Sequence, residues 1–176
     1  MLELRGAARV IQLRDITLRR GSEPLIEQSS LTVHAGSRIG LIGANGAGKS
    51  TLFALLRGEL TVDAGELSLP THWTIAHLAQ ETPGLPIPAI EHVLDGDTQL
   101  RQAEAEVAAA EQREDGERIG YAFANLEAAG GYDARARASA LMHGLGFAAE
   151  VQSQPVAAFS GGWRVRLNLA RALMCP

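Results

Sequence analysis

Residues 39–51 read IGLIGANGAGKST, and this stretch decides the fold class of the chain. Within it, residues 43–50 match the phosphate-binding pattern G-x-x-x-x-G-K-[ST] at every fixed position. An apolar segment typical of a strand precedes the pattern, and the apolar spacing of residues 50–57 predicts a helix directly after it. A glycine-rich loop in that context turns successive backbone N–H groups toward a phosphate, and the helix N-terminus adds its positive end. The sequence therefore predicts a P-loop.

The residues of this loop have distinct expected roles toward a nucleoside triphosphate. Lys49 would bridge the β- and γ-phosphates, and the Ser50 hydroxyl would ligate Mg²⁺. Lys49 is also the only lysine beside fifteen arginines, and a compact ammonium fits between two phosphates better than a guanidinium fork does. We therefore expect ATP and Mg²⁺ as ligands. The predicted phosphate-binding set is Gly43, Ala44, Asn45, Gly46, Ala47, Gly48, Lys49, Ser50 and Thr51.

Two other nucleotide-binding classes compete with this interpretation. A GTPase reads guanine with an Asn-Lys-x-Asp loop, and the single lysine of this chain already belongs to the P-loop. A small-molecule kinase remains compatible with the P-loop taken alone. A second motif is needed to distinguish such a kinase from an ATPase.

The composition is that of a globular protein with little bias toward charged partners. The chain has 176 residues, 46% of them hydrophobic, and a net charge of −4. This length suits one domain or two small subdomains, and the charge gives no global reason to expect DNA or membrane binding. The first ten residues lack a signal-peptide pattern, no apolar run is long enough for a membrane span, and one cysteine fits a reducing compartment. We expect a cytoplasmic protein.

Local patterns divide the chain into a strand-rich part and a helical part, an α/β class overall. Strands are predicted over 11–18, 31–33, 39–42, 66–69 and 74–79, with one helix over 50–57. After a proline cluster, helices are predicted over 89–94, 99–112, 117–129, 133–144 and 164–174, with Asp133 as a cap. We therefore expect a leader at 1–9 that need not be ordered, a P-loop part at 10–85 and a helical part at 86–176, with a helical hairpin at 99–129.

A second motif lies at residues 159–163, which read FSGGW. Ser160 is a favourable N-cap, and the two glycines after it leave the first backbone amides of a helix uncovered. On its own this pattern is equally consistent with an ordinary capped helix. A P-loop kinase has no use for such a helix start, so the two motifs together favour a different class of protein.

Taken together, the motifs resemble the nucleotide-binding domains of ABC ATPases. Residues 159–163 match their LSGGQ signature with Phe for Leu and Trp for Gln, and Gln80 lies where the Q-loop glutamine is expected. Residues 40–51, 79–82, 145–147 and 160–167 are similar to the ABC-F family in particular. The resemblance implies an incomplete P-loop ATPase of the ABC type. It also implies that Gln80 assists hydrolysis and approaches Mg²⁺ with ATP. The signature residues Ser160, Gly161, Gly162 and Trp163 would cap ATP held by a second ATPase domain.

The ABC-F resemblance implies an ATPase without membrane domains, from a family in which several members act on the ribosome. The hairpin at 99–129 lies where that family inserts an arm, although it also suits the helical subdomain's own helices. The alternative is the ATP-binding subunit of a membrane transporter. Trp163 and the charged hairpin favour the ABC-F interpretation.

The chain departs from the family pattern in two places. Arg20 stands where an aromatic residue usually stacks on adenine; a guanidinium can also stack there, but base selectivity then stays open. The chain ends at Pro176, whereas the family continues into the Walker B strand and the catalytic glutamate. We therefore expect residues 1–176 alone to lack turnover.

Overall fold

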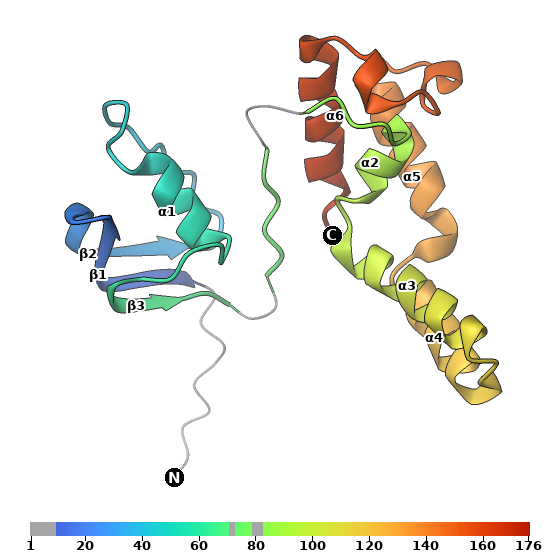
Figure 1. Cartoon of the computed structure of the whole chain (residues 1–176), viewed down its shortest axis with the longest axis horizontal. Helices are drawn as coiled ribbons and strands as arrows, with labels where there is room; N and C mark the ends of the chain where they lie inside the picture. The colour runs from blue at the N-terminus through green and yellow to red at the C-terminus, as the bar shows by residue number, and fades with distance from the viewer. Residues whose placement is uncertain (1–9, 71–72, 79–82) are drawn as a thin grey trace. The chain divides into compact units, whose positions relative to one another are not determined.

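The computed structural model of this chain describes residues 10–70, 73–78 and 83–176. It comprises two compact units, Met1–Trp73 and Thr74–Pro176 (Figure 1). The described strands all belong to the first unit, and the second is helical. The division at residues 73 and 74 lies ahead of residue 85, where the sequence changes character. The predicted leader at 1–9 lies outside the described residues.

An antiparallel sheet forms the base of the first unit. It contains β1 (Val10–Arg20), β2 (Glu23–His34) and β3 (Ala64–Ser68) in the order β2-β1-β3. The central strand pairs Leu13 with Leu31 on one side and with Leu67 on the other. Its alternating apolar side chains are buried together with Leu55 of α1 (Lys49–Leu56), which makes a small core.

Two predicted strands are absent from the described structure. Residues 37–44 and 74–78 are assigned to no helix or strand, so the predictions over 39–42 and 74–79 were wrong as far as the structure describes them. The apolar pattern suits a strand, but a strand also needs a neighbour to complete its ladder of backbone hydrogen bonds. No described strand pairs with residues 39–42. Ile42 is consequently 93% exposed.

The second unit is a helical assembly around one core. Its helices are α2 (Ala89–Leu94), α3 (Thr98–Gln112), α4 (Gly116–Ala128), α5 (Gly131–Gly144) and α6 (Gly161–Met174), with short 3₁₀ turns at Ala149–Val151 and Val156–Ala158. The core includes the fully buried Val93, Leu100, Met142, Phe147 and Leu167. No helix in the described ranges has the length and apolar character needed to cross a membrane.

The predicted helical hairpin is present as α3 and α4, which extend away from the other helices of the unit (Figure 1). The Asp97 carboxylate accepts a hydrogen bond from the Leu100 N–H at 3.0 Å and caps α3. Asp115 caps α4 in the same way, through the Arg118 N–H at 3.2 Å. Three alanines are buried on these two helices, and their small size allows the backbones to approach closely: Ala103, Ala110 and Ala122.

The start of α5 differs from the sequence prediction. Gly130, in the left-handed conformation with φ of 67°, is the N-cap, so the predicted cap at Asp133 was wrong. A residue without a side chain adopts this conformation at little cost and reverses the chain directly after α4. Asp133 lies in the first turn of α5, where its negative charge still favours the helix N-terminus.

Candidate nucleotide-binding site

The P-loop closes around its own lysine at the N-terminus of α1. The Lys49 ammonium donates hydrogen bonds to the carbonyl oxygens of Gly43 at 2.6 Å and of Ala44 at 2.7 Å. Gly46 and Gly48 have φ values of 86° and 88°, a region that side chains rarely adopt. A Cβ on Gly48 would also lie 3.3 Å from the Leu25 side chain. The curl of the loop therefore depends on glycine at these two positions.

This geometry presents several groups suited to a phosphate on one surface. Residues 43–47 are exposed, so their backbone is accessible to a ligand. Ser50 is exposed in the first turn of α1, and Thr51 beside it is half-buried. The loop, Lys49 and Ser50 thus meet at the positive end of a helix, as the motif predicted. Glycine amides, an ammonium and a hydroxyl are the donor set that a triphosphate with Mg²⁺ requires.

Two predicted site residues cannot be placed. Gln80 lies outside the described residues. Arg20 is the last residue of β1, and its side chain lies outside the described part of the structure. Their expected roles beside ATP stay predictions.

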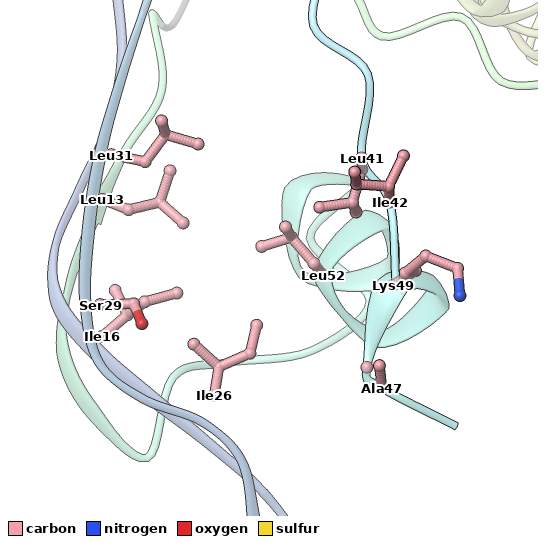
Figure 2. A pocket seen from close by; sticks show the side chains of 11 residues that line it. Leu13, Ile16, Ile26, Ser29, Leu31, Leu41, Ile42, Ala47, Lys49 and Leu52 are labelled. Atoms are coloured by element: carbon pink, nitrogen blue, oxygen red, sulfur yellow. The ribbon is translucent and has the colours of Figure 1, made fainter. Parts of the chain in front are cut away.

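An apolar cavity of about 250 Å³ lies beside the loop. Figure 2 shows side chains of β1 and β2 on one side, and those of α1 and the P-loop segment on the other. Its lining includes Leu13, Ile16, Leu31, Leu41 and Leu52. Such a surface does not suit a phosphate, so the charged part of a nucleotide fits the amide face of the loop and not this cavity.

The second motif begins α6 as predicted, with Ser160 at the N-cap. The Ser160 carbonyl accepts from the Arg164 N–H at 2.9 Å, but the expected side-chain cap hydrogen bond is absent. Gly161 and Gly162 are exposed, and a Cβ on either would meet nothing within 4 Å. The helix start thus has room for an anion at its bare amides. This helix start belongs to the second unit, and the P-loop belongs to the first.

Trp163 has a packing role that the sequence did not reveal. Its ring meets that of Phe147 edge-on, with centroids 4.8 Å apart and an interplanar angle of 69°. Phe147 also contacts Phe159 edge-on at 5.5 Å, and the Arg166 guanidinium lies 4.7 Å from the Trp163 ring centroid. These contacts hold the first turn of α6 against the core. Phe147 lies in the stretch 145–147 that resembles the ABC-F family, but nothing in the sequence linked it to Trp163.

Comparison with known proteins identifies the family. A family model described as ABC transporter matches residues 26–176. The chain belongs to the ABC family. Solved ABC structures share its fold: an ATP-binding subunit of an ABC transporter superposes with a TM-score of 0.64 at 19% identity, covering 94% of this chain and 62% of that one. A nucleotide-free ATP-binding cassette gives 0.62 at 20%, covering 94% and 64%. The predicted fold class is therefore confirmed.

Curated relatives confirm the resemblance to the ABC-F group. Probable ATP-binding protein YheS of Escherichia coli K12 is 45% identical over 94% of this chain and 26% of its own length. ATP-binding cassette sub-family F member 3 of Homo sapiens is 36% identical over 93% of this chain and 23% of its own. Protein GCN20 of Saccharomyces cerevisiae is 36% identical over 86% and 23%. The chain thus spans about a quarter of the length of these relatives.

Proposed function

We propose that this chain is the ATP-binding part of a cytoplasmic ABC-F ATPase that couples ATP binding and hydrolysis to action on the ribosome. The observation that carries the proposal is the joint presence of a formed P-loop, a bare signature-helix start and an α3–α4 hairpin between α2 and α5. The ABC-F relatives support this choice over a transporter subunit. Translation is the process in which we place the full-length protein.

In this proposal the P-loop holds the triphosphate and Mg²⁺. The exposed glycine-rich backbone surrounds the phosphates, and Lys49 exchanges its two carbonyl acceptors for phosphate oxygens. Ser50 provides a hydroxyl for the metal ion, Gln80 approaches the same ion, and the Arg20 guanidinium stacks on the base. The bound ion would neutralise phosphate charge.

The signature residues act on a second ATPase domain. The helix that begins with Ser160, Gly161, Gly162 and Trp163 would cap, through its amides, the γ-phosphate bound by that second domain. The signature of the second domain would in turn cap the ATP held by Lys49. Ser160→Ala should therefore leave ATP affinity of residues 1–176 unchanged and lower turnover of the full-length protein. A weakened affinity in residues 1–176 alone would show that Ser160 serves the ATP of its own chain.

We also propose that residues 1–176 bind ATP without hydrolysing it. Hydrolysis needs a group that orients the attacking water, and in ABC ATPases a glutamate after the Walker B strand supplies it. Phosphate release by purified residues 1–176 should stay at background. Release that survives purification and disappears in Lys49→Ala would place the catalytic group within these residues.

The test of the whole proposal is the ATPase rate of the full-length protein with purified ribosomes. We expect ribosomes to stimulate phosphate release, and Lys49→Ala to abolish the stimulated rate. Stimulation by membranes holding a transporter, with no response to ribosomes, would support the transporter-subunit alternative instead.

A further inference from the structure

We propose that the joint Asp95-Gly96-Asp97, between α2 and α3, locks the α3–α4 hairpin to the signature helix α6, so that the two move as one body. A glycine between two helices would ordinarily allow them to bend against each other. In this chain three separate sets of contacts oppose that bending. The inference goes beyond the proposed function, because the locking itself needs neither ATP nor a partner.

The first set of contacts fixes α2 to α6. Both helices contribute fully buried residues to the same core, including Val93 from α2 and Leu167 from α6. The His92 Nε2 and the Asn168 Oδ1 lie 3.0 Å apart, and both side chains are buried. A hydrogen bond in such a site has strict geometry, because losing it would leave polar atoms without water. The short helix α2 therefore cannot slide along α6 freely.

The second contact lies at the joint itself. A Cβ built on Gly96 would overlap the backbone carbonyl of Arg171 in α6. Only glycine allows the joint to approach the backbone of the signature helix this closely. Gly96 itself is therefore seated directly on the backbone of α6 at Arg171, with no side chain of its own in between.

The third set is an ion-pair cluster across the joint, centred on Arg101 of α3. Its guanidinium donates to Asp95 at 2.8 Å, to the Glu91 carboxylate at 2.8 Å and to Glu104 at 2.7 Å. The Arg101 side chain is only 28% exposed. The hydrogen bond from Arg101 lowers the pKa of Glu91, which keeps that carboxylate charged. Because Glu91 and Asp95 belong to α2 and its C-cap, the cluster holds the α2–α3 angle.

Helix α5 adds two more ion pairs to this cluster. Arg135 pairs with Glu91 at 2.8 Å, and Arg137 lies 3.5 Å from the buried carboxylate of Asp97. Asp97 in turn caps α3. The root of the hairpin is thus held by charged groups of three helices. Since α3 has fifteen residues and rises by about 22 Å, a small rotation of α6 would displace the hairpin tip several times further than the joint.

The experiment measures how tightly the hairpin is held. Cys175 is replaced by Ser, and spin labels are attached to cysteines introduced at the exposed positions Gln112, at the end of α3, and Leu173, on α6. Pulsed electron paramagnetic resonance gives the distribution of the distance between the labels. We expect a narrow distribution in this background and at least a twofold broader one after Arg101→Gln or Asp95→Asn. The matched control is Arg118→Gln, which removes one exposed ion pair at the far end of the hairpin and should leave the width unchanged.

Circular dichroism of each variant distinguishes a loosened joint from a lost fold. Broadening at unchanged helicity supports the locked joint. An unchanged width in both Arg101→Gln and Asp95→Asn would overturn it, and so would loss of helicity in both, because the residues would then maintain the fold and not the angle. No nucleotide or ribosome is present, so failure here is distinguishable from failure of the proposed function.

Discussion

The ammonium nitrogen of Lys49 lies 2.6 Å from the carbonyl oxygen of Gly43, and this contact spans the P-loop from the first turn of α1 back to the first glycine of the motif. With the second bond to Ala44, two of the three ammonium donors of the lysine are used within the loop. Phosphate oxygens are stronger acceptors because they carry charge. The loop is therefore closed by the same side chain that a triphosphate would recruit.

Lys49→Ala should abolish nucleotide binding in the full-length protein, whereas Arg20→Ala should weaken it only modestly. Lys49 would make charge-assisted contacts to phosphate, while stacking of Arg20 on a base contributes about 1–3 kcal/mol. Titration with a fluorescent ATP analogue measures both affinities. Equal losses from the two substitutions would contradict this ranking.

Trp163→Gln, which introduces the residue usual in the LSGGQ signature, should destabilise the helical unit by about 1–3 kcal/mol. The substitution removes the edge-on contact with Phe147 and the apolar area that it buries. Urea unfolding followed by circular dichroism gives the free energy. Tyr132→Gln is the control: Tyr132 is an exposed aromatic residue on α5, and its loss should change stability by less than about 0.5 kcal/mol. Equal effects would mean that the ring contact adds no stability.

His92 should make the chain less stable in weak acid. Burial lowers the pKa of His92 below its ordinary value of 6.5, despite the opposing effect of the hydrogen bond that its ring donates to the Asn168 Oδ1. As pH falls through that ordinary value the unfolded chain takes up the proton first, so unfolding becomes more favourable. His92 should thus lower the free energy of unfolding from about pH 7 to about pH 5.

The matched comparison for this pH effect is His92→Gln against His143→Gln, since His143 is exposed. Only the His92 variant should flatten the pH dependence of the urea midpoint. If wild type and His92→Gln kept the same slope between these pH values, another group would be responsible.

The hairpin should bind ribosomal protein, or RNA only through its few arginines. Residues 99–129 hold three arginines against seven acidic residues, a net charge of −4, whereas affinity for RNA ordinarily depends on positive charge. Deleting the hairpin tip should therefore reduce ribosome pelleting in a way that changes little with salt. A large, steeply salt-dependent loss would show that phosphate contacts dominate.

Local chemistry explains why much of the architecture was predictable. The P-loop was predicted from fixed spacing, and its curl depends on two glycines at positive φ. The roles of Lys49 and Ser50 toward ATP stay predictions. The helices were also predicted closely, because the residue spacing and the breakers that indicate a helix act between neighbouring residues. These signals need no knowledge of distant contacts.

The features that were missed all depend on partners distant in sequence. The apolar segment 39–42 has the pattern of a strand but no described neighbour to pair with. The contacts of Trp163 with Phe147 and of His92 with Asn168 join side chains that only the folded helices bring together. Arg101 had no distinguishing pattern, because an arginine among glutamates on a helix usually forms a solvated surface.

Residues 37–44, which lead into the P-loop, influence the entropy change when a ligand binds. With residues 37–44 in no helix or strand, no described ladder of backbone hydrogen bonds holds them, and each residue that a ligand immobilises would cost about 1–2 kcal/mol of conformational entropy. Capture of a phosphate by this chain should accordingly release heat, lose entropy and weaken steeply on warming. Any strand that pairs with residues 39–42 would remove that entropic cost in advance and act as a preorganising element for the site.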